Sequence, residues 1–281
     1  MTQEENIFLA KRNLVDSIWK SANLEGINVT FPETQMIIDG FSVGNKTIED
    51  LTVILNLKRA WQYLLTTIND EVNLSYIQDI HRLVGRDLVH KSGFLRTANV
   101  RISGTEYIPK LPIDYEIKNE INKILENNDK KDKALDLMLY LMRNQLFFDG
   151  NKRTAMLIAN KILIENGEGI FSVKQQDMQE FFIKLVKFYE TNKSAEVKKF
   201  CKVKCIETFD ERKQDDKIKI HKPEPIEFSS INIDEIDKND SSVMDEFRAN
   251  YSAKNQSDTD KNDDDDKDDG GKSSSTKKYK P

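Results

Sequence analysis

The stretch from Lys133 to Gly167, KALDLMLYLMRNQLFFDGNKRTAMLIANKILIENG, decides the fold. Two segments that are apolar nearly all round meet there across a short polar turn. A helix without a polar face must be buried, so the pattern predicts two helices at the centre of a helical bundle. The turn between them combines one acidic, one small, one amide and two basic residues: Asp149, Gly150, Asn151, Lys152 and Arg153.

Further helices are expected on both sides of this stretch. Apolar residues recur there at helical spacing, and capping residues or glycines bound the segments. The expected helices cover residues 4–26, 31–40, 47–68, 75–88, 113–127, 177–192 and 194–209.

The segment from Gly93 to Pro112 has a different pattern. Residues that favour strands alternate with polar residues around Gly104, which predicts one β-hairpin. The sequence therefore predicts an all-α fold, a mainly helical bundle, with one small β-hairpin.

Charge separates a body from a tail. The segment from Glu207 to Pro281 holds 21 acidic and 14 basic residues, and the totals of 48 and 43 leave 27 and 29 for the rest. The slightly basic body suits an anionic ligand such as a nucleotide, but it lacks the basic face that duplex DNA would require. Like-charge runs predict that residues 210–281 are a mostly disordered acidic tail. We therefore divide the chain into N-terminal helices (1–45), a helical core (46–209) and this tail.

No membrane partner is expected. The sequence has no run of eighteen apolar residues, and its first residues are charged and polar, so neither a transmembrane helix nor a secretory signal is predicted. Cys201 and Cys205 lie four residues apart, and two thiols do not complete a zinc site. Reduced thiols predict a cytoplasmic protein.

The polar turn has the residue types of an anion site. A glycine lets the backbone approach a ligand closely, and the start of the next helix presents free N–H groups beside Lys152 and Arg153. Asp149 next to a bound phosphate suits Mg²⁺, which favours one or two carboxylates plus phosphate oxygens. The alternative is an ordinary connection between two helices, with Asn151 as the cap.

Three segments of the sequence carry a family resemblance. QLFFDGNKR resembles the signature of the Fic (Fido) family, His-x-Phe-x-Asp/Glu-Gly-Asn-Gly/Lys-Arg, which lies between two central helices. The expected hairpin resembles the flap with which the family holds a target segment by strand addition. SANLEG, from Ser21 to Gly26, resembles the family's inhibitory motif, Ser/Thr-x-x-x-Glu-Gly/Asn, on an N-terminal helix. The resemblance extends to about residue 205 and implies a Fic-type helical bundle.

The resemblance implies a site for ATP with Mg²⁺ and for a protein target. Family members transfer AMP, or another phosphate-containing group, to a hydroxyl of a protein. The resemblance implies that Asp149 holds the metal ion and that Phe147 anchors the core. It also implies that Glu25, in a motif beginning at Ser21, is the inhibitory carboxylate. The residues that would bind the phosphates are Gly150, Asn151, Lys152 and Arg153. The residues that would bind the target at the flap are Ile102, Ser103, Gly104, Thr105 and Tyr107.

Two positions depart from the family pattern. Gln145 stands at the position of the histidine that takes the proton from the attacking hydroxyl. A neutral amide cannot act as that base. Met156 stands where many members have a further arginine that binds the terminal phosphate, and the run from Lys152 to Ala155 resembles the phosphate-transferring branch that includes the phage toxin Doc. Nucleotide orientation is therefore open.

The departures leave alternatives for other residues. Glu25 would meet Lys152 or Arg153, or would face solvent before the stop at Gly26. The three histidines, His81, His90 and His221, are expected in ordinary surface or helix-end roles.

Four functions are compatible with these residues. We favour a nucleotide-binding Fic-fold protein with impaired or no transferase activity. The alternative is an active transferase of AMP or phosphate from ATP to a protein hydroxyl, autoinhibited by Glu25. The other two are removal of the transferred group by water and a purely structural module that binds an extended peptide. A homodimer is compatible with the sequence, which does not fix the oligomeric state.

Overall fold

Two central helices organise the molecule, α7 (Lys130–Asn144) and α8 (Asn151–Glu165). The computed structural model describes residues 1–209. Every residue of α8 from Arg153 to Ile164 is buried, and α7 buries most of its apolar residues. The predicted pair of core helices is therefore confirmed, since neither helix presents a broad polar face. The acidic tail predicted for residues 210–281 lies outside the described residues.

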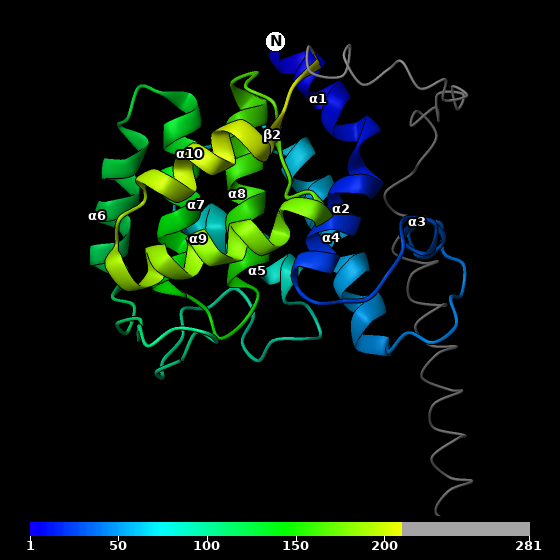
Figure 1. Ribbon diagram of the computed structural model, residues 1–281, viewed down its shortest axis with the longest axis horizontal. Helices are drawn as coiled ribbons and strands as arrows, with labels where there is room; N and C mark the ends of the chain where they lie inside the picture. Colours follow the sequence, from blue (N-terminus) through cyan, green and yellow to red (C-terminus); the bar gives the residue numbers. More distant parts are fainter. Residues whose placement is uncertain (210–281) are drawn as a thin grey trace, which may run out of the picture. The chain divides into compact units, whose positions relative to one another are not determined.

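The other elements surround this pair (Figure 1). Helix α1 packs on α8, α2 packs on α4, and α6 packs on α7. The predicted helix 4–26 is two helices, because the chain breaks at Asn13. The described elements besides α7 and α8 are α1 (Gln3–Arg12), α2 (Leu14–Leu24), α3 (Phe31–Ile38), α4 (Ile48–Thr66), α5 (Leu74–Val84), α6 (Asp114–Leu125), β1 (Ile170–Phe171), η1 (Gln175–Asp177), α9 (Met178–Thr191), α10 (Ala195–Lys204) and β2 (Ile206–Glu207).

The mainly helical fold is confirmed, but the predicted hairpin from Gly93 to Pro112 is wrong in detail. That segment, here called the flap, is a loop without strands. The side chain of Arg96 donates hydrogen bonds to carbonyl groups that would otherwise pair the two strands of a hairpin. Pro109 has no N–H to donate to such a pairing. The one sheet among the described residues pairs β1 with β2, antiparallel, with Ile170 opposite Glu207.

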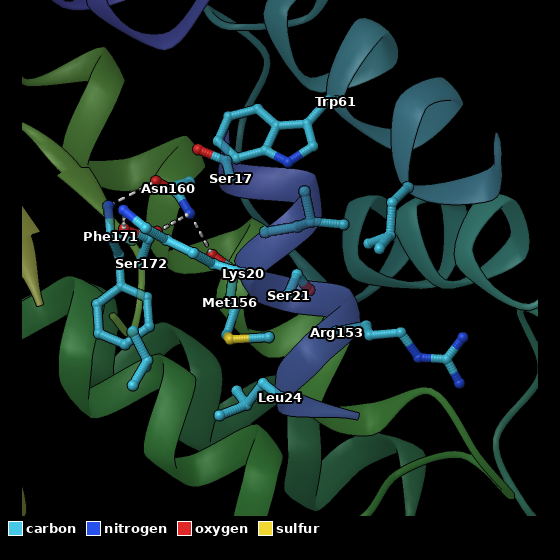
Figure 2. A pocket seen from close by; sticks show the side chains of 13 residues that line it. Ser17, Lys20, Ser21, Leu24, Trp61, Arg153, Met156, Asn160, Phe171 and Ser172 are labelled. Carbon is cyan, nitrogen blue, oxygen red and sulfur yellow. Dashed lines mark hydrogen bonds between the residues drawn. The ribbon is translucent and has the colours of Figure 1, made fainter. Parts of the chain in front are cut away.

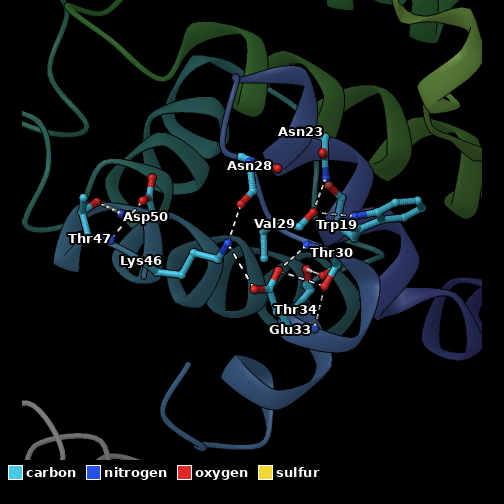
Figure 3. Close-up of polar contacts among 10 residues, drawn as sticks. All are labelled: Trp19, Asn23, Asn28, Val29, Thr30, Glu33, Thr34, Lys46, Thr47 and Asp50. Atoms are coloured by element: carbon cyan, nitrogen blue, oxygen red, sulfur yellow. Dashed lines mark hydrogen bonds and ion pairs between the residues drawn. The ribbon is translucent and has the colours of Figure 1, made fainter. Parts of the chain in front are cut away.

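The end of α2 is held firmly (Figure 3). Trp19 Nε1 and Asn23 Nδ2 both donate to the carbonyl of Val29, at 2.9 and 3.1 Å. Lys46 Nζ donates to the carbonyl of Asn28 at 2.6 Å and pairs with Glu33 at 3.2 Å. These contacts fix the loop that follows Glu25, so that residue has a defined position relative to the core.

The N-terminal helices share the core of the central pair. Leu9, Ile18 and Leu24 belong to the same buried cluster as the apolar residues of α7 and α8. Lys20 Nζ pairs with Glu207 Oε1 at 3.1 Å and with Asp16 Oδ2 at 2.6 Å, so α2 is tied to β2. Within residues 1–209, no helix is long and apolar enough to cross a membrane.

Candidate functional site

The polar turn between α7 and α8 is built on two residues in the left-handed backbone region. Gln145 ends α7 at φ 47°, and Gly150 precedes α8 at φ 75°. A Cβ added at Gly150 would lie 3.3 Å from Val84 Cγ1 and 3.5 Å from His81 Nε2. Glycine therefore meets both needs at this position, a positive φ and a close approach to α5.

Asn151 braces the turn from inside. Its Oδ1 accepts from the N–H of Phe147 at 3.0 Å, and its Nδ2 donates to the carbonyl of Phe147 at 2.8 Å and to Gln145 Oε1 at 3.1 Å. Asn151 is buried and these bonds occupy its amide. Its side chain shapes the turn, and a ligand would meet the backbone at the start of α8.

Arg153 is a buried cation, and some of its N–H donors have no acceptor within residues 1–209. Only 4% of the residue is exposed, and its Nη2 donates to Asp149 Oδ2 at 3.0 Å. Its Nε and Nη1 have no hydrogen-bond acceptor among the described residues. A buried N–H group without an acceptor costs roughly 1–3 kcal/mol. The turn therefore presents unpaired donors where an anion would be stabilised.

Glu25 reaches this turn from the end of α2. Its Oε1 lies 3.5 Å from Lys152 Nζ, and its Oε2 lies 3.8 Å from Arg153 Nε. Of the two positions considered for Glu25, the structure has the one that meets both cations. The separations are ion pairs without hydrogen bonds, and Oε1 is itself buried without a hydrogen-bond donor.

Ser21 lies one turn before Glu25 and accepts the Glu25 N–H at its carbonyl, at 3.3 Å. Its side chain lines a small pocket between α2, α4 and α8 (Figure 2). Met156 lines the same pocket beside Leu24, whereas the guanidinium of Arg153 points away from Lys20. At position 156, α8 therefore contributes an uncharged, apolar side chain to this pocket.

Gln145 is held in a neutral network. Its Nε2 donates to the carbonyl of Met142 at 2.5 Å, and its Oε1 accepts from Asn151. The oxygen keeps a second lone pair, so it can accept a hydrogen bond from a hydroxyl group. It has no titration near neutral pH, so it cannot remove that proton.

His81 lies next to the turn and stabilises it through hydrogen bonds to main-chain groups. Its ring stacks on Phe147 with centroids 3.7 Å apart. The N–H of Gly93 donates to Nδ1 at 2.8 Å, so Nε2 carries the proton and donates to the carbonyl of Asp149 at 2.8 Å. Burial lowers the pKa of His81 to about 4. Both ring nitrogens are used, so His81 does not replace the base missing at Gln145.

The other two histidines make no contact with the turn that the described residues record. His90 is exposed in the loop after α5, and His221 lies outside residues 1–209. Sequence reasoning missed the role of His81. The available signal was its place on the apolar face of α5 with Ile77, Ile80 and Val84, all of them buried.

The flap residues differ in exposure. Ser103 and Gly104 are exposed at the tip, and Ile102 is half-buried. Thr105 Oγ1 accepts from the N–H of Tyr107 at 3.1 Å, and the guanidinium of Arg143 stacks 3.7 Å above the Tyr107 ring. The tip is therefore open, and Tyr107 fastens one arm of the flap to α7.

Known proteins resemble this chain in sequence and in fold. Residues 71–163 match the Fic/DOC family. Proteins called protein adenylyltransferase Fic match from Aedes aegypti, with 27% identity over 61% of this chain and 36% of the relative, and from Nematostella vectensis, with 28% identity over 59% and 41%. The chain thus covers well under two thirds of these relatives.

Solved structures share the fold at low identity. A Fic-1 fragment from C. elegans superposes with a TM-score of 0.58 at 19% identity, covering 69% of this chain and 61% of that one. A Fic family protein from Desulfovibrio desulfuricans gives 0.57 at 17% identity, covering 69% and 62%.

Proposed function

Because residues 71–163 form a Fic/DOC family domain, we propose that the chain binds ATP at the turn from Asp149 to Arg153 and transfers AMP poorly or not at all. The observation that carries the proposal is the pairing of two features in one turn. Arg153 is buried with unpaired N–H groups, and Gln145 offers no proton acceptor beside it.

The binding half of the proposal rests on the donors around the turn. The unpaired guanidinium N–H groups of Arg153, the ammonium of Lys152 and the free backbone N–H groups at the start of α8 all belong to this one turn. A helix N-terminus with adjacent cations stabilises phosphate groups through hydrogen bonds and charge. Gly150 supplies the positive φ and the close packing on α5 that set the start of α8.

Mg²⁺ suits the same turn. The side chain of Asp149 is 68% exposed, and Arg153 contacts one of its two oxygens. A carboxylate of this kind, together with phosphate oxygens and water, matches the coordination that Mg²⁺ prefers. When bound, the ion would neutralise charge on the phosphates.

The catalytic half of the proposal rests on Gln145. Loss of a general base typically costs about 10²–10⁴-fold in rate, or about 3–5 kcal/mol of barrier. Gln145 Oε1 would accept a hydrogen bond from a target hydroxyl and so align it. Positioning without deprotonation supports slow transfer at most.

A second candidate is an active transferase that Glu25 inhibits. The observation that favours it is the contact of Glu25 with both Lys152 and Arg153. The carboxylate occupies the electrostatic position of an anion, so phosphate and Glu25 would compete for the same cations. On this proposal the flap holds a protein segment near Gln145, and Ser103 and Gly104 at the open tip face that segment.

Calorimetric titration with ATP and Mg²⁺ tests the binding half. We expect binding by the Glu25→Gly protein and its loss in Glu25→Gly, Arg153→Met. Lys161→Met in the Glu25→Gly background is the matched control, since Lys161 is also a buried cation of α8 but pairs with Glu165. The absence of binding in both the native and the Glu25→Gly proteins would refute a nucleotide role.

A further inference from the structure

Arg96 joins the flap to the end of α7. Its side chain is fully buried, with 1% exposure. It donates from Nε to the carbonyl of Gln145 at 2.6 Å and from Nη1 to the carbonyl of Ala98 at 2.8 Å. Its Nη2 donates to the carbonyls of Pro109, at 3.3 Å, of Lys110, and of Asn144, at 3.5 Å.

These carbonyls belong to two separate segments. Ala98 lies in the arm that enters the flap, and Pro109 and Lys110 lie in the arm that leaves it. Asn144 and Gln145 are the last residue and the C-cap of α7. One side chain therefore closes the base of the flap and fixes that base to the residue at the histidine position of the family pattern.

From this arrangement we infer that Arg96 is a positioning residue, which sets the distance between the flap and the anion-binding turn. Arginine suits the task because its fork carries five N–H donors and no acceptor. The final carbonyls of a helix lack intrahelical partners and carry partial negative charge, so α7 ends where a cation is favourable. A lysine has three donors from one atom and cannot span both arms and α7.

A second contact supports the same geometry on the other side of the turn. The imidazole of His81 accepts the N–H of Gly93, at the entry to the flap, and donates to the carbonyl of Asp149. Arg96 and His81 both bind main-chain groups. These two residues thus position the flap through its backbone, and the exposed residues at its tip, Ser103 and Gly104, stay available to a bound protein segment.

The reason for positioning the flap rests on the proposed function. The position of the flap can be tested independently of that function. Arg96 contacts no residue from Asp149 to Arg153 through its side chain. It acts on the site by holding Gln145 and the flap in register. Flap position is measurable without nucleotide, so failure of this inference is separable from failure of nucleotide binding.

Spin labels at Ser103→Cys and Lys123→Cys measure the distance from the flap tip to α6. Both positions are exposed, and the native Cys201 and Cys205 are buried, with 0% exposure, so they stay unlabelled. The labelled protein is compared with versions that also carry Arg96→Lys or Arg96→Met. Lys161→Met is the control, because it removes a buried cation that has no contact with the flap.

We expect a narrow distance distribution in the native protein and in Lys161→Met, and a broad one in both Arg96 variants. Trypsin cleavage after Arg101 and Lys110 should rise roughly tenfold in the Arg96 variants, because cleavage follows the population of the open flap. ATP affinity in Arg96→Lys should stay within about threefold of native, a change of less than 1 kcal/mol.

An unchanged flap distance in the folded Arg96 variants, with only a lower melting temperature, would overturn the inference. If both variants fail to fold, trypsin on the native protein decides. Cleavage in the flap as slow as global unfolding supports the tether, and cleavage at the rate of a free peptide refutes it.

Discussion

The two buried arginines on either side of Gln145 differ in what their guanidinium groups bind. Arg96 is 1% exposed, and its side chain donates to five main-chain carbonyls. Arg153 is 4% exposed, yet its Nε and Nη1 have no acceptor among the described residues. Burial alone therefore does not distinguish a residue that holds the fold from one prepared for a ligand.

The difference follows from the cost of desolvation. A buried charge is tolerated where hydrogen bonds replace water, as they do for Arg96. At Arg153 the surrounding structure leaves donors unpaired, and the nearest carboxylates, Asp149 and Glu25, supply one hydrogen bond and one long ion pair. An anion that fills the gap would recover the cost, which is the physical basis of the proposed nucleotide site.

The largest effect is expected at Gln145, whose carbonyl Arg96 binds. Gln145→His in a Glu25→Gly background should raise transfer from labelled ATP by about 10²–10⁴-fold, because it restores a proton acceptor. Histidine tolerates the positive φ found there. Labelling of proteins in a lysate, including self-labelling, measures the rate. Gln145→Asn is the control, and a histidine variant no faster than it would contradict the assignment.

Removing each arginine tests the comparison directly. Arg96→Met should lower the free energy of unfolding by about 4 kcal/mol, since buried carbonyls lose their donors. In a Glu25→Gly background, Arg153→Met should change it by no more than about 1 kcal/mol, because no buried carboxylate then loses its partner and Asp149 is largely exposed. Urea denaturation followed by circular dichroism measures both. Equal losses would remove the distinction between a tether and a ligand-binding residue.

The second tether of the flap, His81, should make stability depend on pH. Burial is the main cause that lowers the pKa of His81 to about 4, with a smaller lowering by Arg153. In the unfolded chain this histidine takes up a proton near its ordinary value, about 6.5. Stability from this group is full above pH 6.5, falls by about 3 kcal/mol as the pH drops to 4, and changes no further below that.

An NMR titration of the three imidazoles measures this directly. His81 should stay neutral to about pH 4 in the folded protein, because burial lowers its pKa. A His81 signal that titrates near 6.5 in the folded protein would show that the hydrogen bonds of its ring are not intact in solution.

The smallest effect is expected for Glu25. Glu25→Gly should tighten ATP binding by about fivefold, or about 1 kcal/mol, because the carboxylate no longer competes for Lys152 and Arg153. Calorimetry with the native and variant proteins measures the change. Glu33→Gln is the control, since Glu33 of α3 pairs with Lys46 and not with Lys152 or Arg153. Equal affinities would mean that Glu25 does not compete with the nucleotide.

Local patterns were sufficient to predict much of the fold. The apolar periodicity of α7 and α8 predicted the core, and the capping residues expected at helix starts are present at α4, where Thr47 and Asp50 form a capping box. One of the two positions considered for Glu25, a contact with Lys152 or Arg153, is the observed one. It could be considered because these two residues are the cations of the turn. These features depend on neighbours in the sequence or on residue type.

Contacts between distant segments were not predictable in the same way. Arg96 binds carbonyls 2 to 49 positions away, and no side-chain pattern specifies a carbonyl acceptor. The alternation around Gly104 predicted strands, but the tether and Pro109 produced a loop. The sequence predicted an ordinary surface or helix-end role for His81, because its two partners, Gly93 and Asp149, come together only in the folded chain.

A crystal structure of the Glu25→Gly protein with ATP and Mg²⁺ tests the central claim most directly. We predict phosphate oxygens within hydrogen-bonding distance of Arg153 Nε or Nη1 and of the backbone at the start of α8, with Mg²⁺ at Asp149. Nucleotide bound elsewhere, with those two N–H groups still lacking an acceptor, would contradict the account.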